Sequence, residues 1–213
     1  MDRVRLHLGD SLEAMKQMDD NTYDLAIVDP PYGINISKAG GYYHKKGKGQ
    51  ANPHTKKDWD NCIPSSEYFE QLRRVSKHQI LWGGNYFTEY LKPSRCWIFW
   101  DKMKFVDNYA DGELAWVSMD RNTKQVRIQH HGFLTKDGRS IHPTQKPVML
   151  YEWILDNFAN EGDKILDTHL GSGSIALACH NRGFQLDGWE IDEEYYNNAL
   201  KRFEQHKAQL TIF

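Results

Sequence analysis

Four consecutive residues, Asp29-Pro30-Pro31-Tyr32, carry the strongest chemical signal in this sequence. They follow the apolar run 25–28, which predicts a buried strand that ends at Val28. Each residue that precedes a proline is restricted to extended conformations, so Asp29 and Pro30 have little freedom. The strand end therefore presents a carboxylate, a backbone carbonyl and a flat ring in a rigid arrangement. Such a set is suited to holding a planar group with an amino substituent, at the sheet edge where ligands bind in open α/β folds.

A glycine-containing loop near the C-terminus is the second candidate site. Residues 167–174, Asp-Thr-His-Leu-Gly-Ser-Gly-Ser, connect a predicted strand to a predicted helix. Glycines let the backbone pass close to a ligand, and a helix N-terminus favours negative charge. Glu190 ends the next predicted strand, where its carboxylate can accept both hydroxyl groups of a ribose. By itself this loop fits a nicotinamide cofactor, S-adenosylmethionine, or a tight turn that binds no ligand.

Size and composition indicate a globular protein. The 213 residues, 39% hydrophobic and 13% aromatic, suffice for one substantial core, with or without a small insertion. No stretch reaches the length of a membrane span, and the charged start lacks the apolar segment of a signal peptide. The three cysteines are far apart, which is typical of reduced thiols in a cytoplasmic protein, and neither they nor the ten histidines show metal-ligand spacing. A net charge of −2 means that any contact with a polyanion must come from a local patch.

Hydrophobic patterning predicts an α/β fold around the two sites. Strands are expected at 4–8, 23–28, 79–82, 96–100, 164–167 and 185–189, and helices after Asp10 or Ser11 and at 65–77, 85–91, 146–158, 174–181 and 193–206. Their alternation predicts a doubly wound, mostly parallel sheet. Residues 102–140 predict a small antiparallel insertion with strands at 113–119 and 125–130. Residues 33–60 lose all apolar periodicity and predict a long basic loop.

Taken together, the motifs resemble those of the DNA amino methyltransferases, in the permuted class whose catalytic half precedes the cofactor-binding half. The matching segments are residues 9–15, Asp29-Pro30-Pro31-Tyr32, the run 142–147 (His-Pro-Thr-Gln-Lys-Pro), the glycine loop and residues 188–192, in that order. They cover most of the chain outside residues 33–60 and 102–140. The resemblance implies a Rossmann-like S-adenosylmethionine-dependent methyltransferase fold, circularly permuted, in a single domain. Thr168-His169 departs from the family, which usually has proline and an aromatic there, and the chain is shorter than is common in the family.

The resemblance also implies residue roles. Asp29, Pro30, Pro31 and Tyr32 form the catalytic set: Asp29 and the Pro30 carbonyl accept the amino hydrogens of the target base, and Tyr32 stacks on it. Asp10 binds the cofactor adenine, Glu190 the ribose, and the glycine loop the methionine portion, with Lys146 available for a carboxylate. The whole cofactor-binding set is Asp10, Asp29, Thr144, Lys146, Asp167, His169, Gly171, Ser172, Gly173, Ser174, Glu190 and Ile191.

The implied activity is site-specific transfer of a methyl group from S-adenosylmethionine directly to N6 of an adenine flipped out of duplex DNA. Aspartate rather than serine at position 29 favours adenine over the nearest rival, N4 of cytosine. Amino methylation of RNA or of a protein glutamine uses similar motifs, but the motif order and the basic loop favour DNA. A catalytically silent nucleic-acid-binding module on the same fold is the alternative from another class, and the intact Asp10, Asp29, Tyr32 and Glu190 oppose it.

Basic residues outside these motifs are candidates for contact with double-stranded DNA. Lys38, Lys45, Lys46, Lys48, Lys56 and Lys57 lie in the long loop directly after Tyr32, and Arg121, Lys124 and Arg127 lie in the insertion, the candidate target-recognition region. On composition alone, a solvated loop is the simpler interpretation of such a lysine run, but its position after Tyr32 favours DNA. The resemblance is compatible with a homodimer, with a cognate restriction endonuclease and with a bacterial or phage origin, and it decides none of them.

Overall fold

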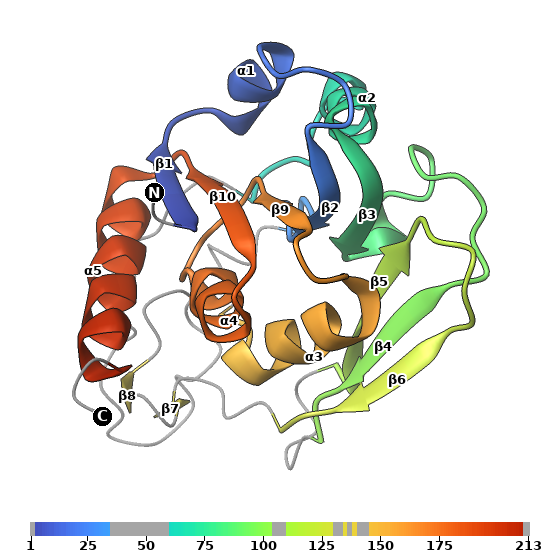
Figure 1. The fold of residues 1–213 in the computed structure, drawn as a ribbon. Coiled ribbons are helices and arrows are strands. Elements are labelled where there is room, and N and C mark those ends of the chain that lie inside the picture. The colour runs from blue at the N-terminus through green and yellow to red at the C-terminus, as the bar shows by residue number, and fades with distance from the viewer. Residues whose placement is uncertain are drawn as a thin grey trace.

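An eight-stranded sheet forms the centre of the molecule (Figure 1). This computed structural model describes residues 3–34, 60–103, 110–129, 134–135, 138–139 and 145–210. The strands of the sheet are β1 (Val4–Leu8), β2 (Tyr23–Val28), β3 (Ser76–Trp82), β4 (Trp97–Asp101), β5 (Gly112–Val117), β6 (Lys124–Arg127), β9 (Lys164–Asp167) and β10 (Gln185–Glu190). They lie in the order β1-β10-β9-β2-β3-β5-β4-β6. A separate two-stranded pair is made by β7 (Leu134–Thr135) and β8 (Gly138–Arg139).

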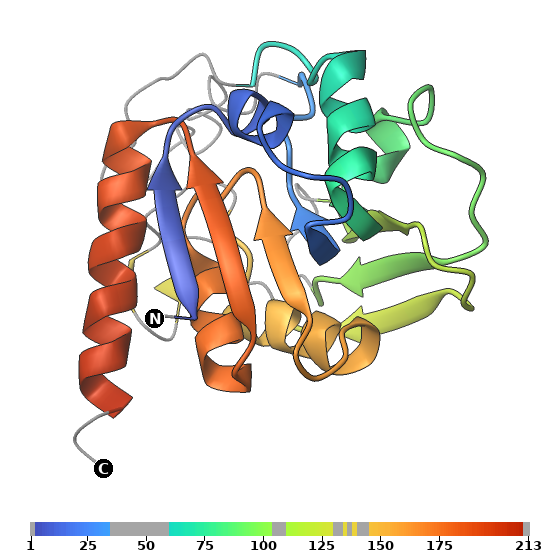
Figure 2. The same ribbon diagram turned by 45° about the horizontal axis from the view of Figure 1, so that its top comes forward.

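Helices cover both faces of the sheet, as Figures 1 and 2 show. One face carries α1 (Ser11–Lys16) and α2 (Ser66–Val75), and the other carries α3 (Val148–Phe158), α4 (Ser174–Arg182) and α5 (Glu193–Leu210). Two apolar cores result, one on each side of the strands. This is the three-layer arrangement that an α/β alternation predicts. Within the described ranges, no helix is long and apolar enough to cross a membrane.

The sheet topology brings the two predicted sites to one edge. Neighbouring strands from β1 through β3 are parallel, and β5 alone runs against the others. The register aligns Leu8 with Glu190 and Gly188 with Asp167, so these strands end together. From β9 the chain passes through α4 to β10 on one side, whereas from β2 it passes through α2 to β3 on the other. The crevice between β9 and β2 is thus a topological switch point, the place where open α/β sheets bind ligands.

Most predicted elements are confirmed, with four differences. The helix predicted at 85–91 is only a 3-10 turn, η1 (Gly84–Tyr86), whose C-cap residue Phe87 has φ −119°. The helix predicted from Lys146 begins at Val148, since Pro147 is its extended N-cap residue. The helix predicted to reach residue 77 ends at Val75, and β3 starts at once with Ser76.

The fourth difference concerns residues 102–140. The two strands predicted there are not a separate antiparallel unit: β5 and β6 both belong to the main sheet, and β6 is parallel to β4. Of the predicted long loop 33–60, only residues 33, 34 and 60 lie within the described part of the chain.

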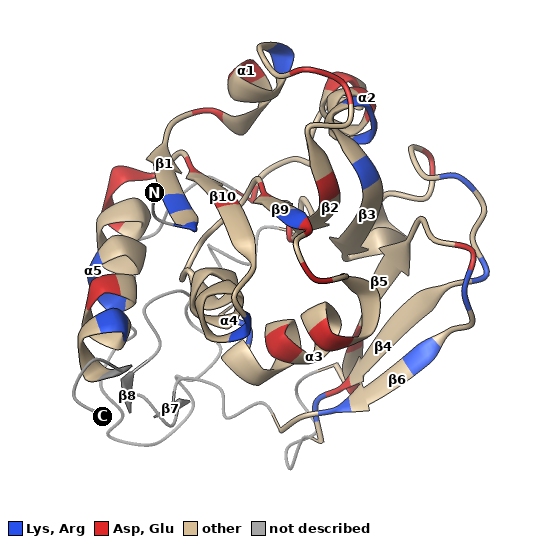
Figure 3. Ribbon diagram, in the orientation of Figure 1, with Lys and Arg blue, Asp and Glu red and all other residues tan. Residues whose placement is uncertain are grey.

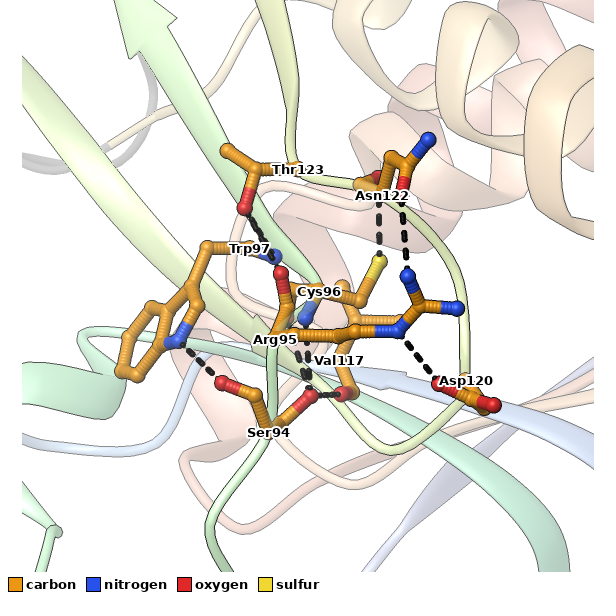
Figure 4. A network of polar contacts seen from close by, with 8 residues as sticks. All are labelled: Ser94, Arg95, Cys96, Trp97, Val117, Asp120, Asn122 and Thr123. Atoms are coloured by element: carbon orange, nitrogen blue, oxygen red, sulfur yellow. Dashed lines mark hydrogen bonds and ion pairs between the residues drawn. The ribbon is translucent and has the colours of Figure 1, made fainter.

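Side-chain hydrogen bonds fasten the start of β4 to the strands beside it (Figure 4). The Ser94 hydroxyl donates to the carbonyl of Val117 at 2.6 Å and accepts from the amide of Cys96 at 3.0 Å. Thr123 donates to the Arg95 carbonyl at 2.9 Å, and the Arg95 guanidinium reaches Asp120 at 2.6 Å. These bonds lie at the edge opposite the switch point, so they secure β4, β5 and β6 and leave the other edge free for chemistry.

The cap of α1 gives a test of the local structure. The Asp10 carboxylate accepts from the amides of Leu12 at 2.8 Å and Glu13 at 3.4 Å, which satisfies two N–H groups of this short helix. We expect Asp10→Ala to lower the free energy of unfolding by about 1 kcal/mol, measured by urea denaturation. Asp10→Ser, which keeps a capping oxygen, is the control and should lose less than about 0.5 kcal/mol. Equal losses in the two variants would contradict the capping role.

Candidate active site

The carboxylate of Asp29 is held from both sides. It follows the buried end of β2, where Ala26, Ile27 and Val28 are at most 1% exposed. Its Oδ1 accepts a hydrogen bond from the Tyr32 hydroxyl at 2.6 Å, and its Oδ2 accepts one from the Lys146 ammonium. The rigid position predicted for the Asp29 carboxylate therefore also depends on a tertiary contact, the one with Lys146.

Lys146 is a buried cation between two carboxylates. Its side chain is 3% exposed, and its Nζ lies 3.2 Å from Glu113 Oε2 in addition to its contact with Asp29. The Lys102 ammonium pairs with the other oxygen of Glu113. Burial would raise the pKa of Glu113, but the charges of Lys146 and Lys102 outweigh it and lower that pKa to about 2. Lys102, Glu113, Lys146 and Asp29 thus form a row of alternating charges whose sum is zero.

The same contacts revise the prediction for Lys146. Burial lowers the pKa of this lysine, yet the nearby Asp29 and Glu113 carboxylates raise it by more, so the ammonium stays charged. Its Nζ also lies 5.2 Å from the centre of the Trp82 ring. The lysine is therefore bound by two protein carboxylates, whereas we had expected it to be available for a carboxylate of a ligand.

The ring of Tyr32 is packed tightly against the segment that follows β3. It stacks on Tyr86 with ring centres 4.9 Å apart and planes 14° from parallel, and Phe87 meets it edge-on at 6.0 Å. A Cβ atom on Gly83 would lie 2.2 Å from Tyr32 Cε1, so only glycine fits there. Burial and the neighbouring Asp29 charge raise the pKa of Tyr32 well above its usual value, which keeps the hydroxyl a hydrogen-bond donor. The glycine pair after a strand was the sequence signal that could have identified this packing.

Two cavities meet at this group of residues. The first lies against the glycine loop and the end of β10, encloses about 80 Å³ and opens beside Ile191, which is 67% exposed. The second has about 380 Å³ and lies on the side of Tyr32, Tyr86 and Glu113. Asp29, Pro31 and Lys146 line both cavities. The early acid and the late glycine loop, far apart in the sequence, therefore line the same cavity, the first.

The glycine loop is organised around Glu190. Its carboxylate accepts from the amide of Gly171 at 2.8 Å and from the amide of Asp192 at 2.9 Å. Gly171 and Gly173 have φ values of 53° and 71°, which favour glycine. A Cβ on Gly173 would approach that of Ala199 to 3.1 Å, so this glycine lets α5 pack closely. Glu190 is held in place with lone pairs still available to a ligand.

The predicted cofactor residues divide into two groups. Those that line the first cavity are Asp29, Lys146, His169, Gly171, Ser172, Glu190 and Ile191. Asp10, Asp167, Gly173 and Ser174 are not among its lining residues, and Thr144 lies outside the described residues. The Ser174 hydroxyl instead contacts Ser172 Oγ at 3.1 Å and accepts from Arg202 at 2.9 Å. Asp10 is separated from the glycine-loop strand by β10, because the sheet order places β1 at its edge.

Asp167 lies beneath the loop and is 2% exposed. Burial raises its pKa to about 8, and the Asp29 and Glu190 charges add to this, although its carboxylate accepts a hydrogen bond from the His169 amide at 3.0 Å. The group is therefore mostly protonated at neutral pH. Its role in the structure is to orient the loop backbone.

The predicted DNA contacts are spread along the sheet. Arg127 lies at the same edge as the two cavities, paired with Asp101 at 3.2 Å. Lys124 is one strand length away, and Arg121 lies near the opposite edge, where it donates to the Asn157 carbonyl at 2.8 Å. Figure 3 shows Lys and Arg on β6 and the turns beside it, with Asp and Glu on α3. The six lysines from 38 to 57 lie outside the described residues.

Known proteins resemble this chain in sequence and in fold. Residues 89–201, more than half of the chain, match the family N6_N4_Mtase, described as DNA methylase. The Type II methyltransferase M.HpaI of Haemophilus parainfluenzae is 24% identical over 94% of this chain and 74% of its own length. The structure of the M1.HpyAVI–SAM complex superposes with a TM-score of 0.61 at 19% identity, covering 93% of this chain and 98% of that one. PvuII DNA methyltransferase (cytosine-N4-specific) gives a TM-score of 0.63 at 13% identity, covering 98% and 91%.

Gly83 provides a test of the packing around Tyr32. Alanine there must displace the tyrosine ring and also adopt a left-handed φ of 68°, so we expect Gly83→Ala to destabilise the protein. Gly162→Ala is the matched control, because Gly162 has φ 88° but no heavy atom within 4 Å of an added Cβ. Thermal unfolding should show Gly83→Ala to be less stable than the control by about 1–3 kcal/mol. Similar losses of stability in the two variants would mean that the Tyr32 ring moves aside at no measurable cost in free energy.

The buried Asp167 predicts how stability depends on pH. An acid with a raised pKa holds its proton more tightly in the folded than in the unfolded state, so stability falls as pH rises from about 3.8 toward about 8. Asp167→Asn keeps the hydrogen-bonding oxygen without the charge. We expect this variant to be more stable than the wild type at pH 8 by at least about 1 kcal/mol, and to lose that advantage near pH 4. Glu161→Gln, at an exposed turn position, is the control and should leave the stability unchanged at both pH 8 and pH 4. If the difference between Asp167→Asn and the wild type did not change with pH, the raised pKa of Asp167 would be refuted.

Proposed function

Because this chain belongs to the N6_N4_Mtase family of DNA methylases, we propose that it transfers a methyl group from S-adenosylmethionine to N6 of adenine in DNA. One observation carries the proposal: the cavity at the glycine loop and the cavity at Tyr32 share Asp29, Pro31 and Lys146 as walls. A methyl donor in the first cavity and a base in the second would meet at Asp29. Direct transfer requires such a meeting point, because donor and acceptor must be held in contact.

The residues of the first cavity fit S-adenosylmethionine. Glu190 is oriented by the amides of Gly171 and Asp192, so its remaining lone pairs can accept the ribose hydroxyls. Ile191 offers an exposed apolar surface beside it, suited to one face of an adenine ring. The enclosed volume of about 80 Å³ takes only part of the cofactor, and the remainder would lie over the open side at Ile191. The cofactor supplies an electrophilic methyl group on a positively charged sulfur.

The second cavity fits a single base. Its volume of about 380 Å³ is within the ~300–1,000 Å³ of ligand pockets. An exocyclic amine of a base is a weak nucleophile, because its lone pair is delocalised into the ring. Asp29 can accept an amino hydrogen and stabilise the positive charge that develops on the nitrogen. The Tyr32 hydroxyl and Lys146 hold the carboxylate in position beforehand, so little reorganisation is needed.

An amino group inside a duplex cannot reach Asp29, so the proposal includes flipping of the target base. Arg127 and the adjoining edge of β4 and β6 are the described region best placed to contact the flanking DNA, since they share the sheet edge with the second cavity. We assign target recognition to residues 102–140 on this basis. N4 of cytosine offers the same amino chemistry, and the aspartate at position 29 is the feature that favours adenine.

Replacement of Asp29 tests the chemistry. We expect Asp29→Asn to lower the rate of methyl transfer at least about 100-fold, because an amide cannot stabilise the developing charge. The affinity for S-adenosylmethionine, measured by calorimetry, should change less than about threefold, since Glu190 and the loop remain. Asp24→Asn, on the same strand but paired with Lys77 at the far end, is the control and should keep full activity. A parallel loss of affinity and rate would assign Asp29 to the cofactor instead.

Mass spectrometry of nucleosides identifies the product. Incubation of the protein with duplex DNA and S-adenosylmethionine should yield N6-methyladenine, and none should form with Asp29→Asn. N4-methylcytosine would replace the adenine assignment but keep the family activity. DNA binding without either product would indicate a silent module.

A further inference from the structure

A chain of hydrogen bonds leads from the protein interior to the ring of His169, which lines the first cavity. His169 Nδ1 lies 2.9 Å from Thr168 Oγ1, and Thr168 Oγ1 lies 2.6 Å from the Tyr68 hydroxyl. Tyr68 and Thr168 are each 3% exposed. The Tyr68 ring also meets the His169 ring edge-on at 5.4 Å. Two side chains, Tyr68 from α2 and Thr168 from the glycine loop, therefore fix the orientation of this imidazole.

The number of available hydrogens decides which groups donate and which accept along this chain of hydrogen bonds. Among the residues that the structure describes, Thr168 is the hydrogen-bond partner of the Tyr68 hydroxyl, so the tyrosine must donate to it. Thr168 then has its own hydrogen left for His169, and Nδ1 must be the acceptor. In the reverse direction the Tyr68 hydrogen would be buried without an acceptor, a costly arrangement. The ring hydrogen of His169 is consequently on Nε2.

The environment also keeps this imidazole neutral. Burial lowers the pKa of His169 to about 4, even though the charge of Asp10 acts in the opposite direction. The ring is therefore a neutral donor at physiological pH. With Nδ1 turned to Thr168, Nε2–H is the ring atom that can meet a ligand in the cavity.

The lysine that lines the first cavity is not free to bind an anionic group. The acids of this cavity include Asp29, Glu190 and Asp192, and the Lys146 ammonium already pairs with two carboxylates. In the glycine loop, the amides of Leu170, Gly171 and Gly173 donate to Trp189, Glu190 and Leu170. These glycines therefore cannot supply the amide cradle that we expected for the methionine portion. Gln145, Tyr151, Ser172 and Tyr195 also line the cavity and carry donor groups, and His169 is the lining residue whose ring N–H is directed by the hydrogen-bond chain described above.

We propose that Tyr68 and Thr168 lock His169 as the Nε2–H tautomer, and that this N–H binds the carboxylate of the cofactor's methionine portion. The ligand in this proposal rests on the function proposed above, whereas the tautomer does not. It gives a purpose to Thr168-His169, the two residues that depart from the family pattern: the ring keeps the shape of an aromatic side chain and adds a donor. Tyr68 and Thr168 are positioning residues, because they act through His169.

The test compares two cofactors. His169→Phe keeps the ring and removes the donor, so its affinity for S-adenosylmethionine should fall about tenfold in calorimetry, as for loss of a hydrogen bond to a charged group. Its affinity for decarboxylated S-adenosylmethionine should change less than about twofold. His180→Phe, on α4 against Phe203, is the control and should affect neither. Equal losses for both cofactors would show that His169 only packs against the ligand, which would overturn the carboxylate assignment.

Nitrogen NMR of the ligand-free protein tests the lock separately. The ¹⁵N shifts of His169 should show a protonated Nε2 and an unprotonated Nδ1 from pH 6 to pH 9, and Thr168→Val should give a mixture of tautomers. A protonated Nδ1 in the wild type would overturn the lock. If the wild type bound neither cofactor, the proposed function would fail while this measurement still decided the tautomer.

Discussion

The ammonium of Lys146, buried between the carboxylates of Asp29 and Glu113, is the interaction on which the site depends. It joins the end of β2, the start of β5 and the segment before α3; Asp29 and Lys146 are 117 residues apart in sequence. A buried charge is tolerated only when it is paired, and loss of one partner typically costs about 3–5 kcal/mol. The position of Asp29 and the pairing of the buried ammonium are therefore coupled. This coupling explains how a carboxylate on a loop can be held as rigidly as one on a strand.

Charge balance distinguishes the parts of the cleft. At the wall between the cavities, two lysines offset two acids, whereas the glycine-loop side is lined by Asp29, Glu190 and Asp192 with Lys146 already paired. An acidic lining favours a cationic ligand. Asp167 adds no further negative charge, because burial raises its pKa and keeps it protonated. A positively charged sulfonium suits this field. In the proposed function, the polyanionic DNA backbone would instead meet Lys124 and Arg127 of β6, the strand on which Figure 3 shows basic residues.

Local patterns predicted the elements well and the contacts between them poorly. The strands 4–8 and 23–28 and the cap at Asp10 follow from apolar runs and capping residues, which act over a few positions. The prediction that the strands within 102–140 form an antiparallel insertion was wrong, because β5 and β6 both pair with β4 of the main sheet and β6 does so in parallel. Glu113 and Tyr68 were missed because a lone acid or tyrosine carries no signal until the fold brings it to a site. Gly83 was missed although the glycine pair 83–84 after a strand was a signal.

The sequence by itself determined the chemistry that is available: an acid with two prolines and a tyrosine after one strand, a glycine loop after another, and an acid after a third. These are local facts, since strand ends and turns are specified by adjacent residues. Only the tertiary structure decided that β2 and β9 are neighbours and that Lys146 serves Asp29 rather than a ligand. It also brought Thr168 to Tyr68. The physical reason is that pairing of strands and burial of charge are long-range, and no window of sequence contains both partners.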